Sequence, residues 1–169
     1  MTNNNENNSL RTFHKNPKID FLFGYFGEMP VPTKQGGYRP VDMVEMNEDG
    51  AEKTIKDFYI KKPDTKSIAK FKEYIHTIAH QEFNDTNIIK MPNDVQVHLS
   101  ISIVKKRYHE VDVDNLAKTI LDSIKGIAFD DDCQVSSLIV EKHIHPMNVN
   151  GLLIGITKIT KERKGLEFK

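Results

Sequence analysis

Acidic residues gather in one short stretch of the chain, from Val111 to Val135. Asp112 and Asp114 stand two residues apart at its start, and an acidic run, residues 130 to 132, stands near its end. Carboxylates that are brought close together repel one another unless a cation neutralises them. Mg²⁺ prefers oxygen ligands and keeps several waters, so the stretch predicts an all-aspartate magnesium site in which Mn²⁺ should substitute.

A hydrolytic role fits such a site, because bound divalent ions activate water and stabilise a departing oxygen. Asn115, Lys118 and Asp122 fall at intervals of three and four, which places them on one face of a helix. Lys118 is suited to bind a phosphate oxygen or the leaving group. Phosphodiester hydrolysis is therefore the predicted reaction, provided that the acids converge. Asp112 and Asp132 more than about 10 Å apart would be too distant to share a metal centre.

Simpler explanations exist for each residue taken alone. An isolated pair of acids beside a helix start is commonly a cap that complements the helix dipole. Lys118 could pair with Asp114 or Asp122, each four residues away, in a surface contact worth about 0.3 to 0.5 kcal/mol. Only the complete set, in its order, favours catalysis over these explanations.

The polar residues of the stretch occur in a defined order with short spacings: Asp112-Val113-Asp114-Asn115-Leu116-Ala117-Lys118, then Leu121-Asp122, then Asp131-Asp132-Cys133-Gln134-Val135. This order resembles the signature of RusA-type Holliday junction resolvases, most densely over about Val95 to Lys142. The resemblance implies a set of metal ligands: Asp112, Asp114, Asp132 and Asp131. It implies catalytic roles for Asp112, Asp114, Lys118 and Asp132, and supporting roles for Asn115, Asp122 and Gln134.

The resemblance also implies a function. By it, the protein is a phage-derived, magnesium-dependent, structure-selective endodeoxyribonuclease that resolves four-way DNA junctions in recombination and repair. The implied fold is a mixed α/β domain, with a mixed sheet and two main helices, that forms a homodimer because two equivalent sites suit a symmetric junction. Two alternatives stay open: a non-catalytic branched-DNA-binding module with a structural cation, and a DxD metal-dependent glycosyltransferase, for which the chain is short.

The composition sets limits on these expectations. With 169 residues, 38% of them hydrophobic, the chain can bury one modest core. Lys plus Arg and Asp plus Glu both total 24, so DNA affinity must come from local basic groups. A single cysteine and the lack of an apolar run of about 20 residues predict a cytoplasmic protein without a membrane partner. The basic groups that we expect to contact DNA are Lys105, Lys106, Arg107, Lys61 and Lys62.

The spacing of the hydrophobic residues predicts the helices and strands that must position the acids. Alternation over 95–103 predicts a strand with one buried face, and apolar spacing predicts helices over 65–83 and 115–125. If the strand conformation persists, Asp112 and Asp114 project to the same side, and Asp114 can also cap the second helix. Further strands are expected at 19–26, 55–62, 134–144 and 152–160, with the last two joined as an antiparallel hairpin.

The chain is expected to have three parts. Residues 1–16 are rich in asparagine and poor in apolar side chains, which predicts a disordered tail. Residues 17–162 are expected to form one RusA-like endonuclease domain. Residues 163–169 are expected to form a short basic tail.

Overall fold

A four-stranded mixed sheet forms the centre of the molecule, with the strand order β1-β6-β4-β5. Its strands are β1 (Phe21–Gly27), β4 (Val95–Ser102), β5 (Val135–His143) and β6 (Asn150–Lys158). β4 and β5 are parallel, whereas β6 is antiparallel to both β1 and β4. The computed structural model describes residues 19–27, 29–33 and 38–161, apart from the side chains of residues 55–57 and 61, and both predicted tails lie outside these ranges.

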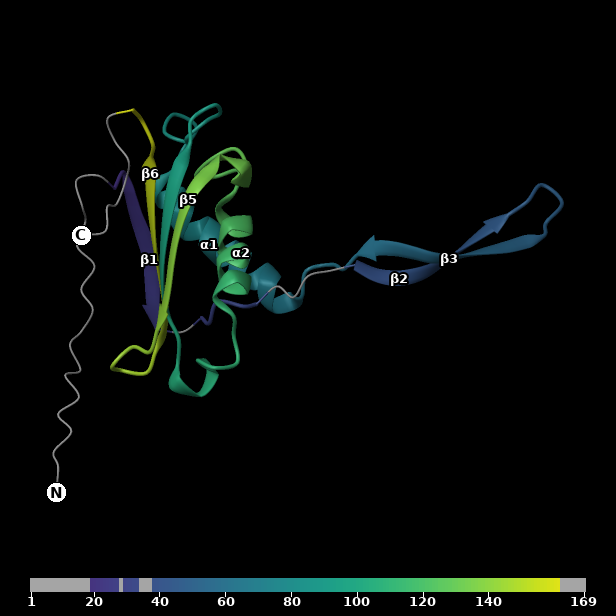
Figure 1. Cartoon of the computed structure of the whole chain (residues 1–169), viewed down its shortest axis with the longest axis horizontal. Helices are drawn as coiled ribbons and strands as arrows, with labels where there is room; N and C mark the ends of the chain where they lie inside the picture. Colours follow the sequence, from purple (N-terminus) through teal and green to yellow (C-terminus); the bar gives the residue numbers. More distant parts are fainter. Residues whose placement is uncertain (1–18, 28, 34–37, 162–169) are drawn as a thin grey trace, which may run out of the picture.

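Two helices cover one face of this sheet (Figure 1). α1 (Lys66–Glu82) begins after Thr65, whose side chain accepts a hydrogen bond from the N–H of Ile68. α2 is formed by Val113–Ile124. The two helices bury apolar stripes, made by Ile68, Phe71, Ile75 and Ala79 of α1 and by Leu116, Ile120 and Ile124 of α2. The predicted mixed α/β fold with two main helices is confirmed.

β4 is the central strand of the core. Its alternating residues pair in register with apolar residues of β6, and all of these side chains are buried: Val97 with Ile156, Leu99 with Ile154, and Ile101 with Leu152. The period of two in the sequence therefore predicted both the strand and its buried face correctly.

The predicted hairpin between the last two strands is wrong, because β4 lies between β5 and β6. The chain leaves β4, forms α2 and returns as β5 parallel to β4, and it then crosses to the other side of β4 as β6. Nearly all residues of β4 are buried, so this strand takes a neighbour on each side. The sequence of the short link between β5 and β6 has no pattern that predicts its crossing over β4.

A two-stranded ribbon, β2 (Tyr38–Met46) with β3 (Glu52–Lys61), extends away from the sheet and helices, and we name it the arm (Figure 1). β2 and β3 pair with each other and with no strand of the central sheet. The strand predicted at 55–62 corresponds to β3, whereas β2 was missed because its side chains show no buried alternating face. The arm exposes large apolar side chains, namely Tyr38, Met43, Val44, Met46, Phe58, Tyr59 and Ile60.

Two further expectations concern the chain as a whole. In the described part of the chain, no helix combines the length and apolar character needed to span a membrane. The limits of the domain, residues 17 and 162, stay a prediction.

Candidate functional site

The two ends of the central sheet are separate places in this fold. Val95 pairs with Val135 at one end, and Ser102 pairs with His143 at the other. We refer to them as the Val95 end and the Ser102 end. Since β4 and β5 are parallel, α2 must run back from the Ser102 end to the Val95 end, and its two termini are therefore far apart.

Asp112 and Asp114 follow the Ser102 end, at the start of α2. After β4 the chain turns through a short 3₁₀ helix, η1 (Lys105–Arg107), so the expected continuation of the strand to these acids is wrong. Asp112, not Asp114 as predicted, occupies the N-cap position of α2, where its side chain makes no capping hydrogen bond, and Asp114 lies in the first helical turn. Both carboxylates are exposed where the helix dipole favours negative charge.

Asn115, Lys118 and Asp122 lie on the side of α2 away from its buried apolar stripe, as predicted. Asn115 Nδ2 donates a hydrogen bond to Asp112 Oδ2 at 3.4 Å, which orients the Asp112 carboxylate. Lys118 is exposed one turn after Asp114, and Asp122 is half-buried one turn further on. This face therefore presents an ammonium group directly beyond the two acids, whereas the roles assigned to these residues stay predictions.

Asp131 and Asp132 lie at the Val95 end, in the 3₁₀ turn η2 (Asp132–Gln134) that precedes β5. Asp131 Oδ1 accepts a hydrogen bond from the N–H of Cys133 (3.1 Å), and Gln134 Oε1 accepts one from the N–H of Asp131 (3.0 Å). The two bonds form a capping box that fixes the turn. Desolvation and the nearby Asp131 carboxylate raise the pKa of the Cys133 thiol, so Cys133 is not an activated nucleophile.

Gln134 ties this acidic turn to the loop before β4. Its side chain is buried, and Nε2 donates hydrogen bonds to the main-chain oxygens of Ile89 (3.1 Å) and Asn93 (2.8 Å). Asp130 adds a further tie, because its Oδ2 accepts a hydrogen bond from the N–H of Met91 (2.9 Å). The acidic turn is therefore held from both sides by polar contacts that span about 40 residues of sequence.

Lys125 neutralises the acids of this turn. Its Nζ lies 2.8 Å from Asp131 Oδ2 and 3.1 Å from Asp132 Oδ1. The hydrogen bond from Lys125 is the main cause that holds the pKa of Asp131 below its usual value, and the two carboxylates raise the pKa of Lys125. The sequence predicted that a helix ends at Lys125, but it did not predict the ion pairs of this lysine with Asp131 and Asp132. A lysine in the last turn of a helix is typical of a helix end and by itself indicates no partner.

Replacing Lys125 with methionine should destabilise the fold at pH 7 and have less effect in acid. The native pKa of Asp131 is lowered, so its contribution is present above the unfolded pKa of about 4 and is lost as the pH falls through the native value. Urea unfolding of wild type and variant between pH 7 and pH 2 measures the difference, which stays small because the pair is exposed. Lys90→Met is the control, since Lys90 has no ion pair among the described residues. A pH-independent difference for Lys125→Met would contradict the assignment.

The two aspartate pairs do not meet within one chain. α2 has 12 residues and is about 18 Å long, and it lies between Asp112 at its start and Asp131 and Asp132 beyond its end. Over the described ranges, no three His, Cys, Asp or Glu side chains lie close enough to hold a metal ion. The four predicted metal ligands therefore do not converge within one chain, and each pair alone offers the one or two carboxylates that Mg²⁺ usually takes from a protein.

Three of the lysines predicted to contact DNA are exposed. Lys105 and Lys106 are exposed on η1, a few residues before Asp112. Lys62 is exposed directly after the arm, and the side chain of Lys61 lies outside the described side chains. Lys105, Lys106 and Lys62 are thus accessible to a phosphate backbone, as their predicted role requires.

Two partly buried cations hold the loops of the Ser102 end. Arg107 Nη2 donates a hydrogen bond to the main-chain oxygen of Val31 (2.8 Å), and burial lowers the pKa of its guanidinium. Lys142 Nζ donates to the main-chain oxygens of Tyr108 (3.0 Å) and Val111 (2.7 Å). Arg107 therefore has a structural task besides its predicted DNA contact, and Lys142 positions the loop that delivers the first acid pair. Neither contact has a signal in the local sequence.

Comparison with known proteins identifies the family. The model of the family described as endodeoxyribonuclease RusA matches residues 41–157, a span that includes both aspartate pairs, α2 and Lys118. A search of curated proteins returns no match to the chain. The family match covers more than half of the sequence. The chain therefore belongs to the RusA family of endodeoxyribonucleases.

Proposed function

We propose that the protein is a magnesium-dependent endonuclease that resolves four-way DNA junctions by paired hydrolysis of phosphodiester bonds. Membership of the RusA family supports DNA hydrolysis and a Holliday junction as the substrate. The exposed carboxylates at the start of α2 support Mg²⁺ as the cofactor, with Mn²⁺ as a substitute. We further propose that it acts in the cytoplasm, in DNA recombination and repair, and that it is of phage origin.

A complete metal site requires two copies of the chain in this proposal. The observation that carries it is the separation of the aspartate pairs at opposite ends of α2. A two-fold rotation about an axis perpendicular to α2 brings the Ser102 end of one copy to the Val95 end of the other. In such a two-fold symmetric dimer the same contact occurs twice, so two equivalent sites form. Two sites related by symmetry suit a substrate in which two strands must be cut.

Each site would then draw on both copies. Asp112 and Asp114 of one copy would hold Mg²⁺ together with Asp132 and Asp131 of the partner subunit. The ion pairs that Lys125 makes with Asp131 and Asp132 within each chain would have to break first. When bound, Mg²⁺ would supply an activated water and offset the charge of the phosphate.

The residues of α2 would complete the site. Lys118 would bind a non-bridging oxygen or stabilise the leaving oxygen. Asn115 would orient the Asp112 carboxylate through the hydrogen bond already formed, and Asp122 would orient the Lys118 ammonium. Gln134 would hold the acidic turn that the second copy uses.

Mixed dimers test both the nuclease and the shared site. We expect Asp114→Asn and Asp132→Asn homodimers to leave an end-labelled four-way junction uncut in Mg²⁺. A dimer with one chain of each kind should regain single-strand nicking, because one of its two sites then receives only unaltered residues. Denaturing gels measure the nicks.

The control is a dimer that mixes Asp112→Asn with Asp114→Asn. These acids belong to the same half of the site, so both sites of that dimer are damaged and no nicking should return. If each chain carried a complete site, both mixed dimers would stay inactive, and that result would refute the two-chain arrangement.

The alternatives left open by the sequence make different predictions. A non-catalytic branched-DNA-binding module would bind junctions and cut none in Mg²⁺ or Mn²⁺. The family match gives no support to a DxD glycosyltransferase. Incision of a four-way junction by the wild type would exclude both.

A further inference from the structure

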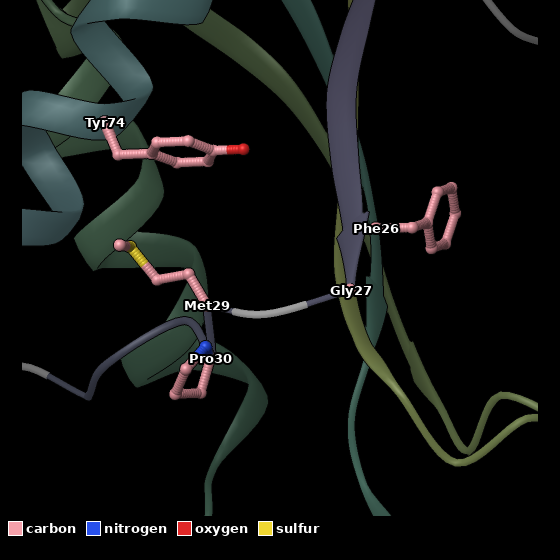
Figure 2. Close-up of a pocket in the computed structure, with 5 residues that line it drawn as sticks. All are labelled: Phe26, Gly27, Met29, Pro30 and Tyr74. Atoms are coloured by element: carbon pink, nitrogen blue, oxygen red, sulfur yellow. The ribbon is translucent and has the colours of Figure 1, made fainter.

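A pocket of about 480 Å³ opens between β1 and α1, beside the segment that follows β1 (Figure 2). It is lined by Phe26, Gly27, Met29, Pro30 and Tyr74. Pockets of a few hundred cubic ångströms with mostly apolar walls bury small ring-shaped ligands. None of these lining residues belongs to the proposed metal site.

The walls of the pocket are fixed by hydrogen bonds. The Tyr25 hydroxyl donates to the main-chain oxygen of Met29 (2.8 Å), and burial raises the pKa of Tyr25, so the hydroxyl keeps its proton. Arg107 donates to the main-chain oxygen of Val31 (2.8 Å), two residues further on. Both contacts hold residues 29–31 against the body of the protein, so this wall of the pocket is in place before a ligand arrives.

Tyr74 offers an aromatic surface to this pocket. Its ring meets the buried Tyr25 ring edge-on, with centroids 5.0 Å apart and an interplanar angle of 84°, and it remains 37% exposed. Figure 2 shows its hydroxyl pointing towards β1, with Met29 on the same side of this strand as Tyr74 and the Phe26 ring on the opposite side. Gly27, which has a positive φ (126°), lines the pocket without a side chain. A flat ring can therefore stack on Tyr74.

The charge beside the pocket favours a nucleic acid over a neutral apolar ligand. Lys66 and Lys70 precede Tyr74 at successive intervals of four, so the three side chains form one strip along α1. Both lysines are exposed. Cations in line with an aromatic ring are the combination by which proteins bind single-stranded nucleic acid, through phosphates and stacked bases.

The pocket lies at the same end of the sheet as the first acid pair. Gly27 pairs with Asn150, and the adjacent Gly151 pairs with Ser102, so β1 and β4 finish side by side on either side of β6. Arg107, which leads to Asp112, contacts the segment that forms the pocket wall. A nucleotide held here would belong to the DNA whose phosphate approaches Asp112 and Asp114.

We propose that this pocket receives a nucleobase from the branch point of the DNA and stacks it on Tyr74, an inference that rests on the proposed function. A base inside a regular duplex is stacked on both sides, and extruding it costs more than extruding a base at a branch point, where the helical stack is interrupted. The pocket would therefore contribute to the choice of junctions over duplex DNA.

The test compares junction and duplex binding in the full-length Asp114→Asn protein, which should leave the DNA uncut. Tyr74→Ala should weaken binding to a four-way junction about tenfold and leave binding to a duplex of the same sequence unchanged, as measured by fluorescence anisotropy. Tyr74→Phe should keep the wild-type affinity, because it keeps the ring. His76→Ala, an exposed change on the same helix that does not line the pocket, is the control.

Photo-crosslinking gives a second measurement. A junction that carries 5-iodouracil at the branch point should crosslink to the peptide that contains Tyr74, and Tyr74→Ala should lose this crosslink. An unchanged junction affinity in Tyr74→Ala, or an equal loss on junction and duplex, would overturn the proposal. A change in oligomeric state without a crosslink would also overturn it, since the pocket would then hold a side chain of a second copy.

The outcomes separate this proposal from the proposed function. If the wild type cuts junctions and Tyr74→Ala behaves like the wild type in every assay, the pocket proposal alone fails. If Tyr74 crosslinks to the branch point and the wild type cuts nothing in Mg²⁺, the nuclease proposal alone fails. If the wild type does not bind junctions at all, both fail.

Discussion

Asp114→Asn should lower the rate of junction incision about a thousandfold, a loss of about 4 kcal/mol of transition-state stabilisation. Asparagine keeps the size of the side chain and removes the negative charge that a divalent cation requires. The fold should survive, because an exposed acid in the first turn of a helix contributes only about 0.3 to 1 kcal/mol. Junction binding should be kept, since the change removes a charge that repels phosphate. Single-turnover incision and anisotropy, both in Mg²⁺, measure the two effects.

Glu110→Gln provides the matched control for this experiment. Glu110 is an exposed carboxylate in the same loop, two residues before Asp112, and it is not one of the predicted metal ligands. Its neutralisation changes the local charge by the same amount and should alter incision only slightly. Similar losses in both variants would show that overall charge, and not a metal ligand, explains the effect.

Gln134→Leu should destabilise the protein by about 2 to 4 kcal/mol. Leucine is of similar size but leaves the main-chain oxygens of Ile89 and Asn93 and the N–H of Asp131 without their present partner. Since Gln134 is only 4% exposed, water cannot easily replace these three hydrogen bonds. Equilibrium unfolding in urea, at one fixed protein concentration, measures the change.

The exposed Gln81 of α1 is the control for this loss. Gln81→Leu removes the same chemical group from the surface and should stay within about 0.5 kcal/mol of the wild type. A loss below about 1 kcal/mol for Gln134→Leu would mean that the acidic turn is not held by these bonds. It would also weaken the supporting role that Gln134 has in the proposed site.

Elements with a regular hydrophobic period could be predicted from the sequence. β4 alternates strictly, and α1 and α2 repeat apolar residues at intervals of three and four, so their burial follows from local spacing. β2 has no buried face, and it therefore left no pattern to detect. The order of the strands also escaped prediction, because the burial of β4 between two neighbours is decided by the whole sheet and not by any link.

The candidate site could be predicted as a set of residues but not as an arrangement. The spacing of Asp112, Asp114 and Lys118 follows from the start of one helix, which is a local feature. The distance to Asp132 depends on that same helix, whose 12 residues hold the two acid pairs apart. The contacts of Lys125 and Lys142 join parts of the chain that only the fold brings together, and no local spacing announces them.

The pairing of β1 with β6 has a consequence for how the protein matures. Phe21 lies opposite Ile156, so partners in this ladder are separated by 135 positions of the polypeptide. During translation β1 emerges long before β6, its neighbour in the sheet, and ladders of such high contact order form slowly. A nascent chain stalled before residue 150 would leave both β1 and one edge of β4 open to wrong partners. The central sheet can therefore be completed only after the ribosome has synthesised β6.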